Sequence, residues 1–320
     1  MANIESVRLP DNSEYNIKDA TAQTKTLATP ITIEGTQETT VEGALTALNR
    51  AVENITNPNL LLNPWFTVNQ RSFSSGSAAA YTVDRWKKAD STGTLTLTSS
   101  GLQFPASTAC EVQQIFETIP WDGKVVTISL MYSDGTIVSG TDTWTTGGDA
   151  KTFIDDGKMI VELNASGNFV LKHNTSDANI RTVRAVKLER GYDHTLHLDV
   201  APEYETELLK CQRYYVRIDY PQYAYICIIA IVSNHEGVGV IPLATPMRAM
   251  PTLSWTGSFN IYMGGGTTKA VYAIVLHGMQ RNSFGAVFSD GTTVAGLTPG
   301  ESAFINAPST GAYIELDAEL

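Results

Sequence analysis

Apolar residues between positions 39 and 55 repeat in alternating steps of four and three, a spacing typical of a coiled-coil seam. This spacing joins Val41, Leu45, Leu48, Val52 and Ile55. Thr39 followed by Glu42 predicts a capping box at the first turn, and Asn57-Pro58 ends the helix. Because two heptads are only marginally stable alone, we expect this helix to form against copies of itself or against a neighbouring element. The pattern therefore predicts an oligomer.

The chain before this helix alternates around a turn. Residues 7–17 place short apolar runs on either side of Pro-Asp-Asn, which predicts a small hairpin. An isolated two-stranded hairpin is marginally stable, so we expect it to dock on another protein. The Thr-rich residues 23–38 predict a linker that leads into the capped helix.

Short strands at regular spacing follow the helix, separated by Asp-Gly and Ser-Gly turns. The predicted strands are residues 81–83, 94–98, 110–115, 125–130, 159–163, 168–172 and 184–188. Such spacing is typical of a β-sandwich, here of jelly-roll type.

A helical spacing of apolar residues interrupts the strands at residues 203–215, with acidic residues first and basic residues last, as the helix dipole favours. Strands then return at residues 224–232, 238–241, 252–255, 259–263, 270–276, 284–288 and 313–316. The run from Tyr225 to Val232 is almost continuously apolar, which predicts a strand buried on both faces, in the core or against another subunit. One helix therefore links two predicted sandwiches.

Composition narrows the possible partners. The net charge of −11, with Lys and Arg spread thinly, argues against a nucleic-acid partner. No apolar stretch is long enough to cross a bilayer and the first residues lack a signal-peptide pattern, so we expect no membrane insertion. The three scattered cysteines, Cys110, Cys211 and Cys227, predict free thiols rather than a disulfide framework or a zinc site.

Several runs resemble a known class of module. Residues 59–71 (NLLLNPWFTVNQR), followed by residues 81–86 (YTVDRW), are similar to the opening of a module in bacteriophage tail-fibre and related virion-fibre proteins. Residues 187–191 (KLERG) and 207–215 (ELLKCQRYY) resemble the closing strand and the exit helix of that module.

The resemblance extends to both ends of the chain. Residues 246–252 (PMRAMPT) and 314–320 (IELDAEL) are similar to the C-terminal tip domain of such fibres, and residues 7–20 resemble an N-terminal element of fibres of phages and prophages of Gram-positive bacteria. The resemblance implies a homotrimer, whereas the seam residues alone do not separate a trimer from a dimer. It also implies attachment to a tail, baseplate or capsid protein, with Leu9, Pro10, Tyr15 and Ile17 as candidate attachment residues.

Together these observations predict a mainly β chain. Its expected parts are a virion-attachment segment (1–22), a linker and a short parallel trimeric coiled coil (23–58), a jelly-roll-like β-sandwich (59–200), a connecting helix (201–218) and a C-terminal β-sandwich tip domain (219–320). The function that the resemblance implies is adhesion of a virion tail fibre to a host-surface glycan or protein. A head fibre with auxiliary adhesion and a glycan-depolymerising tailspike are the alternatives.

Sugar binding requires a flat aromatic side chain with polar groups around it. Trp121, and Trp144 with Asp142 and Asp149 nearby, are the candidate ligand-binding residues. We predict no catalytic residues, since the adjacent pair Asp155-Asp156 is typical of a turn and no nucleophile motif is present. No metal ligands and no cofactor are predicted either, because His194 and His197 form the one close histidine pair and lack a full ligand pattern.

Overall fold

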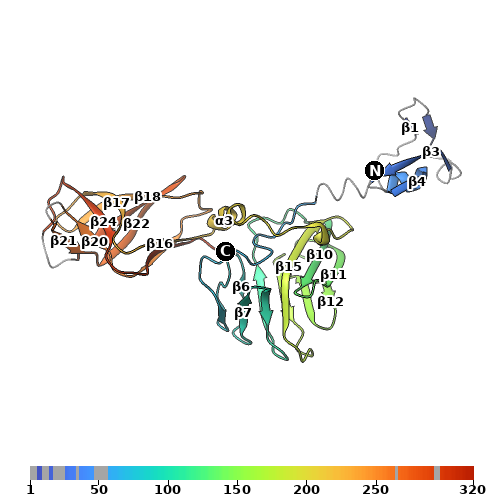
Figure 1. Cartoon of the computed structure of the whole chain (residues 1–320), viewed down its shortest axis with the longest axis horizontal. Coiled ribbons are helices and arrows are strands. Elements are labelled where there is room, and N and C mark those ends of the chain that lie inside the picture. The colour runs from blue at the N-terminus through green and yellow to red at the C-terminus, as the bar shows by residue number, and fades with distance from the viewer. Residues whose placement is uncertain are drawn as a thin grey trace.

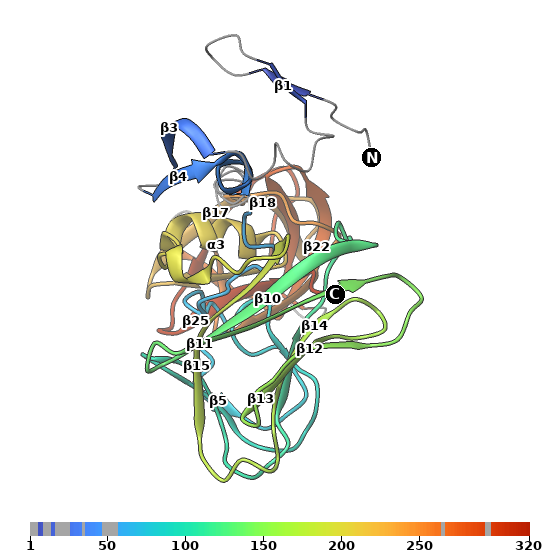
Figure 2. The ribbon, with the colours of Figure 1, turned by 90° about the vertical axis from the view of Figure 1, so that its right-hand side faces the viewer.

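The computed structural model describes residues 6–8, 14–16, 26–33, 36–46, 57–263, 266–291 and 296–320. The protein is mainly β, and its paired strands run antiparallel. Figure 1 shows an elongated chain with short strands at the N-terminal end, one sandwich in the middle and a second sandwich at the far end. Figure 2 looks along the long axis and shows the second sandwich behind the first.

The N-terminal segment contains two small sheets. Strands β1 (Ser6–Arg8) and β2 (Glu14–Asn16) pair antiparallel, as the predicted hairpin requires. Strands β3 (Thr26–Ile33) and β4 (Thr36–Thr40) also pair, where the sequence pattern predicts only a linker. Thr and Ile dominate β3 and β4, and β-branched residues favour extended backbone. The structure therefore corrects the linker prediction for these residues.

A helix begins at residue 41 and is described as far as residue 46. The Thr40 hydroxyl accepts a hydrogen bond from the Gly43 backbone N–H at 3.0 Å, so Thr40 caps this helix, while Thr39 still belongs to β4. The N-cap thus lies one residue later than predicted, and with Gly43 three residues after it the reciprocal half of a capping box has no side chain to form it. Within the seam, Val41 is half-buried and Leu45 is exposed. The other seam residues, Leu48, Val52 and Ile55, lie outside the described residues, as do the attachment residues Leu9, Pro10 and Ile17, whereas Tyr15 lies in β2.

The first sandwich contains eleven strands in two sheets. Their bounds are β5 (Ser75–Gly76), β6 (Lys87–Lys88), β7 (Leu95–Thr98), β8 (Gly101–Phe104), β9 (Glu111–Gln114), β10 (Lys124–Tyr132), β11 (Ile137–Trp144), β12 (Lys151–Asp155), β13 (Met159–Leu163), β14 (Phe169–His173) and β15 (Arg181–Arg190). One sheet has the order β11-β10-β15-β8-β7-β5, and the other has the order β12-β13-β14-β9-β6. Their inward-facing side chains share one hydrophobic core.

The two sheets approach each other at β11 and β12. A Cβ atom added at Gly140 in β11 would lie 1.7 Å from the backbone oxygen of Phe153 in β12, so only glycine allows this contact. The predicted strands omit β5, β6, β8, β11 and β12. Strand β11 carries Ser, Gly, Thr and Asp at exposed or half-buried positions and lacks a clear apolar alternation. Residues 81–83, predicted as a strand, contribute only an isolated bridge from Tyr81 to Lys87.

Helix α3 (Tyr204–Gln212) follows the short 3-10 helix η1 (Leu196–Leu198) and packs on the first sandwich. Its buried Glu207 carboxylate accepts a hydrogen bond from the Asn63 backbone N–H at 2.6 Å. The predicted helix is confirmed, but it ends well before residue 218 because Tyr215 already begins the next strand. Cys211 on this helix and Cys110 are buried free thiols, and Cys227 is a half-buried one.

The second sandwich contains ten strands. They are β16 (Tyr215–Tyr220), β17 (Ala224–Ile231), β18 (Glu236–Pro242), β19 (Thr252–Thr256), β20 (Asn260–Tyr262), β21 (Thr268–Ala270), β22 (Ala273–Gln280), β23 (Ser283–Ser289), β24 (Ser302–Ala307) and β25 (Ala312–Asp317). One sheet has the order β16-β25-β19, and the other has the order β21-β20-β24-β17-β18-β23-β22. A second hydrophobic core lies between them.

Strand β17 differs from its prediction. Ile229 and Ile231 lie in the core, but Tyr225 and Ile228 on the opposite face are exposed, as is Val232 just beyond the strand. Within one chain the apolar run is therefore buried on one face only.

The residues that follow β25 return to the first sandwich. Arg85 is fully buried there and forms an ion pair with Glu319. Its guanidinium also donates a hydrogen bond to the Ile115 carbonyl at 2.6 Å and lies 3.5 Å from the centre of the Tyr214 ring. Burial raises the pKa of the Glu319 carboxyl, and the nearby Arg85 charge acts against this shift. This buried ion pair joins the two sandwiches.

Further contacts surround that pair. The Arg71 guanidinium lies 3.5 Å from the centre of the Tyr215 ring and 3.4 Å from a carboxylate oxygen of Glu319. The Tyr81 hydroxyl donates a hydrogen bond to the Leu320 carbonyl at 2.7 Å. Burial, and then the Glu319 charge, raise the pKa of Tyr81 to about 12. The junction is thus built from desolvated aromatic and charged groups contributed by both sandwiches.

Candidate functional site

The structure places the two predicted ligand-binding tryptophans in the core. Trp144 is 0% exposed, and its indole N–H donates a hydrogen bond to the Asn164 carbonyl at 3.1 Å. Trp121 is 1% exposed and packs edge-on against Phe116, with ring centres 4.7 Å apart. Neither ring presents a flat face to solvent. The prediction that these two rings stack on a sugar is therefore wrong, because Trp144 ends an edge strand with its side chain turned inward.

The two predicted acidic partners are exposed. Asp142 forms an ion pair with Lys151 at 3.1 Å across the β11–β12 edge. Its backbone neighbour Thr143 also donates to this carboxylate, and both contacts lower the pKa of Asp142, the hydrogen bond from Thr143 most. Asp149 lies on the exposed loop between β11 and β12. Neither carboxylate lines either of the two pockets described below.

A different aromatic side chain, Trp65, lies at the surface. It follows Asn63, which is fully buried and adopts a positive φ of 50°. The Asn63 side chain donates hydrogen bonds to the carbonyls of Val68 and Asp84 at 2.8 and 2.9 Å, and its oxygen accepts one from the Val68 backbone N–H. These bonds fold residues 63–68 into a tight turn. Phe66 points into the core as a result, and the preceding Trp65 is left half-buried.

The same turn is fixed to its neighbours on two sides. The Trp86 indole N–H donates to the Asn63 carbonyl at 2.9 Å, and the Val186 backbone N–H donates to the Pro64 carbonyl at 3.0 Å. Pro64 also restricts the backbone that precedes Trp65. The backbone that carries Trp65 is therefore fixed before a ligand binds, so no loop ordering has to accompany stacking on the ring.

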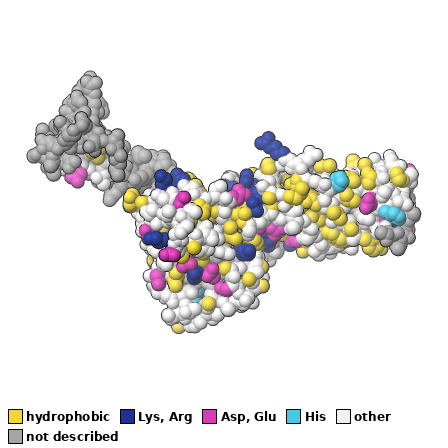
Figure 3. All heavy atoms as spheres, turned by 180° about the vertical axis from the view of Figure 1, so that it is seen from behind, with side chains coloured by type: hydrophobic (Ala, Val, Ile, Leu, Met, Phe, Trp, Pro, Cys, Tyr) yellow, Lys and Arg dark blue, Asp and Glu magenta, His cyan; other side chains and the backbone are white. Residues whose placement is uncertain are grey.

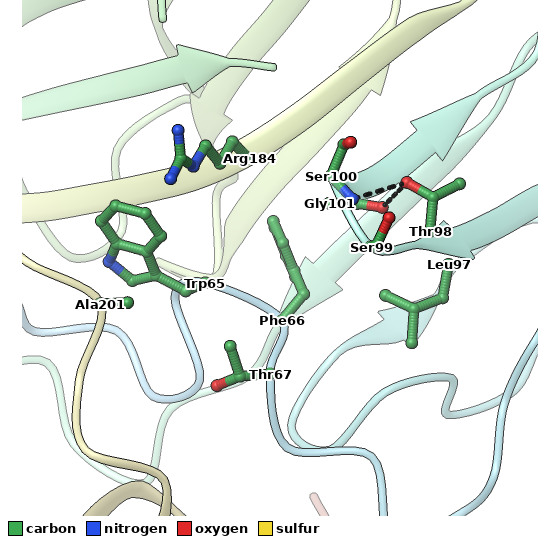
Figure 4. A pocket seen from close by; sticks show the side chains of 10 residues that line it. All are labelled: Trp65, Phe66, Thr67, Leu97, Thr98, Ser99, Ser100, Gly101, Arg184 and Ala201. Carbon is green, nitrogen blue, oxygen red and sulfur yellow. Dashed lines mark hydrogen bonds between the residues drawn. The ribbon is translucent and has the colours of Figure 1, made fainter.

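Trp65 and the exposed Arg184 of β15 form one wall of a half-open pocket of about 400 Å³. The Arg184 guanidinium lies 5.4 Å from the centre of the Trp65 ring. Figure 4 shows the turn between β7 and β8 on the opposite side of this pocket, with hydroxyl groups from Thr98, Ser99 and Ser100. The complete lining is Trp65, Phe66, Thr67, Leu97, Thr98, Ser99, Ser100, Gly101, Arg184 and Ala201.

This arrangement suits a ligand with both apolar and hydroxyl-bearing surfaces. An indole face packs against the C–H face of a sugar ring, and hydroxyl side chains can donate to or accept from its hydroxyl groups. Arg184 adds a charged, planar donor, which binds carboxylate or phosphate groups on a sugar especially well. The volume lies within the roughly 300–1,000 Å³ that is usual for small-molecule sites.

A smaller pocket of about 210 Å³ lies near the junction of the two sandwiches, lined by Trp121, Arg85, Glu117 and Tyr214 among others. Arg85 and Glu117 already have ion-pair partners there, Glu319 for the first and Arg213 for the second. His194 and His197 stack edge-on with ring centres 5.3 Å apart. The described residues hold no group of three His, Cys, Asp or Glu placed to bind a metal ion, and none of the described helices is long and apolar enough to span a bilayer.

The sequence carries a partial signal for the Trp65 pocket. Asn63-Pro64-Trp65-Phe66 stands out as a run, but a structural role as an anchor explains it equally well from sequence alone. Arg184 and the hydroxyls of residues 98–100 carry no motif, because three segments far apart in the chain meet only after the sandwich has folded. The chain matches no protein-family model, no curated protein and no solved structure.

Proposed function

We propose that this chain is a trimeric tail fibre of a bacteriophage that adheres to a glycan on the host surface through the Trp65 pocket. The pocket carries the proposal, because an indole on a fixed turn, a guanidinium and several hydroxyls surround a cavity of about 400 Å³. The elongated arrangement of two sandwiches in Figure 1 agrees with a fibre. The resemblance of residues 59–71 and 246–252 to fibre modules points the same way.

Assembly would give the adhesion its strength. A shallow site on one chain binds a sugar weakly, but three copies on one stalk convert later binding events into intramolecular ones. The seam from Val41 to Ile55 would join the copies, and the N-terminal hairpin would attach them to a virion protein. In this account the protein needs neither a cofactor nor a catalytic step.

Adhesion is favoured over glycan cleavage by the chemistry of the pocket. A glycoside hydrolase commonly needs two carboxyl groups about 5–9.5 Å apart across the scissile bond. The ten residues that line this pocket, all of them described, include no Asp or Glu. A sugar held there would therefore meet donors and an aromatic face, without a general acid.

The test is binding of the purified, fluorescently labelled chain to the bacteria that the phage infects. Trp65→Ala removes the stacking face and Arg184→Met removes the charged donor, so each should lower the apparent affinity at least tenfold, a loss of about 1.4 kcal/mol. Tyr192→Ala is the control, since Tyr192 is an exposed aromatic residue of the same sandwich that does not line the pocket. It should bind like wild type.

Thermal melting of each variant verifies that the fold is retained. Wild-type binding by both pocket variants, with unchanged melting temperatures, would contradict the assignment of the ligand site to this pocket.

A further inference from the structure

The two outer faces of the second sandwich differ sharply in chemistry. On the three-stranded sheet, Glu315 accepts hydrogen bonds from the hydroxyls of Tyr215 and Ser254, and Arg217 stacks on the Tyr313 ring at 3.8 Å. This face is polar and charged, as expected where one side of an antiparallel sheet meets water. The seven-stranded sheet does not follow that rule.

Its strand register places apolar side chains outward on most strands. Ala230 of β17 pairs with Val238, Val238 pairs with Val287, and Val287 pairs with Val275, which forms one apolar row across β17, β18, β23 and β22. A second row joins Tyr262, Phe304 and Ile228 across β20, β24 and β17. We call these two rows, together with Tyr225, Val232 and Val240, the outer apolar face.

Aromatic residues gather at one side of this face. The Tyr225 ring lies 5.4 Å from the Phe304 ring and 6.0 Å from the Tyr262 ring, measured between centres. Tyr225 and Phe304 are nevertheless exposed. Aromatic clusters of this kind are common at the centres of protein interfaces and unusual on surfaces that only meet water.

Charge is almost absent from the face. Among the described outward positions of the seven strands, the acidic or basic side chains are Glu236 at the start of β18 and His277 on the edge strand β22. Figure 3 agrees, since it shows many hydrophobic and few charged side chains on the visible side of the second sandwich. A surface without charge offers nothing to steer a charged partner, whereas it can pack against an equivalent uncharged surface.

The size of the face also suits an interface. Seven strands spaced about 4.8 Å apart, with about six residues each at ~3.3 Å, cover roughly 600 Å². That area, which includes the polar outward positions of the sheet, approaches the roughly 800 Å² that a standard interface buries on each partner. The N-terminal seam independently predicts that several copies of the chain lie side by side, which brings equivalent faces together.

We propose that the outer apolar face of the seven-stranded sheet packs against another copy of this chain. It would be a second self-association surface, at the opposite end of the molecule from the seam. The inference goes beyond the proposed function, because it concerns how copies meet and requires no receptor. It also accounts for the apolar run from Tyr225 to Val232, which is buried on one face within a single chain and would be buried on both in the assembly.

Site-directed labelling of the full chain tests the proposal. Val240 near the middle of the face is 57% exposed in one chain, and Ile180 in the first sandwich is 58% exposed. Val240→Cys and Ile180→Cys should therefore react equally fast with a maleimide if the chain stays single. If another copy covers the face, Val240→Cys should react at least tenfold more slowly than Ile180→Cys in purified protein at micromolar concentration.

Each outcome has a clear meaning. Equal labelling rates would overturn the proposal even if the seam keeps the chains together, because the labelling rate measures whether the outer apolar face is accessible to solvent. Equal rates in purified protein followed by protection on addition of lipid vesicles or host-cell extract would overturn it as well, in favour of a different occupant. A protected Val240→Cys chain that does not bind cells would contradict the proposed adhesion and leave this interface standing.

A charge-insertion variant gives a second readout. Val240→Lys places an ammonium group in the outer apolar face. The substitution should lower the molar mass that light scattering measures on dilution, or it should lower the melting temperature of the assembly. Ile180→Lys is the matched control and should do neither. Identical behaviour of the two lysine variants would also overturn the proposal.

Discussion

At the scale of single residues, side-chain direction decides which aromatic residues can bind a ligand. Trp144 and Trp65 both follow polar or loop-like sequence, but Trp144 is in the core and Trp65 lines a pocket. The sequence around Trp144 contains Asp, Thr and Gly, so it reads as a loop, whereas its residues pair with β10 as an edge strand. Edge strands carry weak hydrophobic alternation, and the face on which a tryptophan lies cannot then be predicted from its neighbours.

Asp177 provides a pH-dependent prediction at this scale. Hydrogen bonds from Arg181, and then from the Asn179 side chain and backbone, hold the pKa of Asp177 well below its usual range. A lowered pKa stabilises the fold above the ordinary aspartate pKa of about 3.9 and loses this contribution as the pH falls toward the folded-state value. Asp177→Asn should therefore have a lower melting temperature than wild type at pH 7. The difference between the two melting temperatures should narrow as the pH falls from about 5 to 2.

Melting temperatures measured across this pH range test the prediction. Arg181→Gln removes the main partner and should show the same narrowing. A difference between wild type and Asp177→Asn that stays constant down to pH 2 would show that the ionised Asp177 carboxylate does not stabilise the fold.

At the scale of elements, strands with strong apolar patterns were predictable, and these include the edge strand β19. The missed strands lie both at sheet edges (β11, β12, β16) and between other strands (β8, β24). The central strands β10, β13, β14 and β15 carry strong apolar alternation or continuous apolar runs, and their predicted positions agree with the structure. The strands β3 and β4 were missed because Thr-rich sequence suits both a linker and an edge pair. Short-range patterns also cannot show that α3 packs against Asn63, since that contact joins positions 144 residues apart.

The approach of β11 to β12 gives a prediction at this scale. Gly140→Ala would place a methyl group 1.7 Å from the Phe153 oxygen, so the two strands must separate. We expect the free energy of unfolding to fall by about 1–3 kcal/mol in chemical denaturation, as for other overpacked sites. Gly76→Ala is the control, because its added Cβ would meet only the end of the Phe73 ring, at 3.3 Å.

Gly76→Ala should stay within about 0.5 kcal/mol of wild type. Equal stability of the two alanine variants would mean that β11 and β12 can move apart without lowering the free energy of unfolding.

At the scale of the whole molecule, the buried Arg85–Glu319 ion pair links the two sandwiches. Arg85→Met leaves Glu319 buried without this partner, which typically costs about 3–5 kcal/mol. We expect calorimetry of this variant to show a separate unfolding transition for each sandwich. In wild type the two sandwiches should unfold together in a single, more cooperative transition. Arg213→Met is the control, since the Arg213–Glu117 pair is largely exposed and should contribute less than about 1 kcal/mol.

A single unchanged transition in Arg85→Met would show that the ion pair does not couple the sandwiches. Sequence could not have indicated this coupling, because Arg85 and Glu319 are 234 positions apart and nothing in the runs that contain them pairs one with the other. The succession of two sandwiches follows from hydrophobic patterns, but the junction between them depends on the buried charges of Arg85 and Glu319.

We propose that several copies of this chain form a fibre on a phage tail. Cryo-electron microscopy of intact phage particles is the sharpest test, since one map gives both the number of copies and the attachment point. We expect threefold density at the tail, long enough for two sandwiches in line and with their seven-stranded sheets facing other copies. Threefold spikes on the capsid would contradict the tail assignment, and single unassociated chains or particles without the chain would contradict the fibre itself.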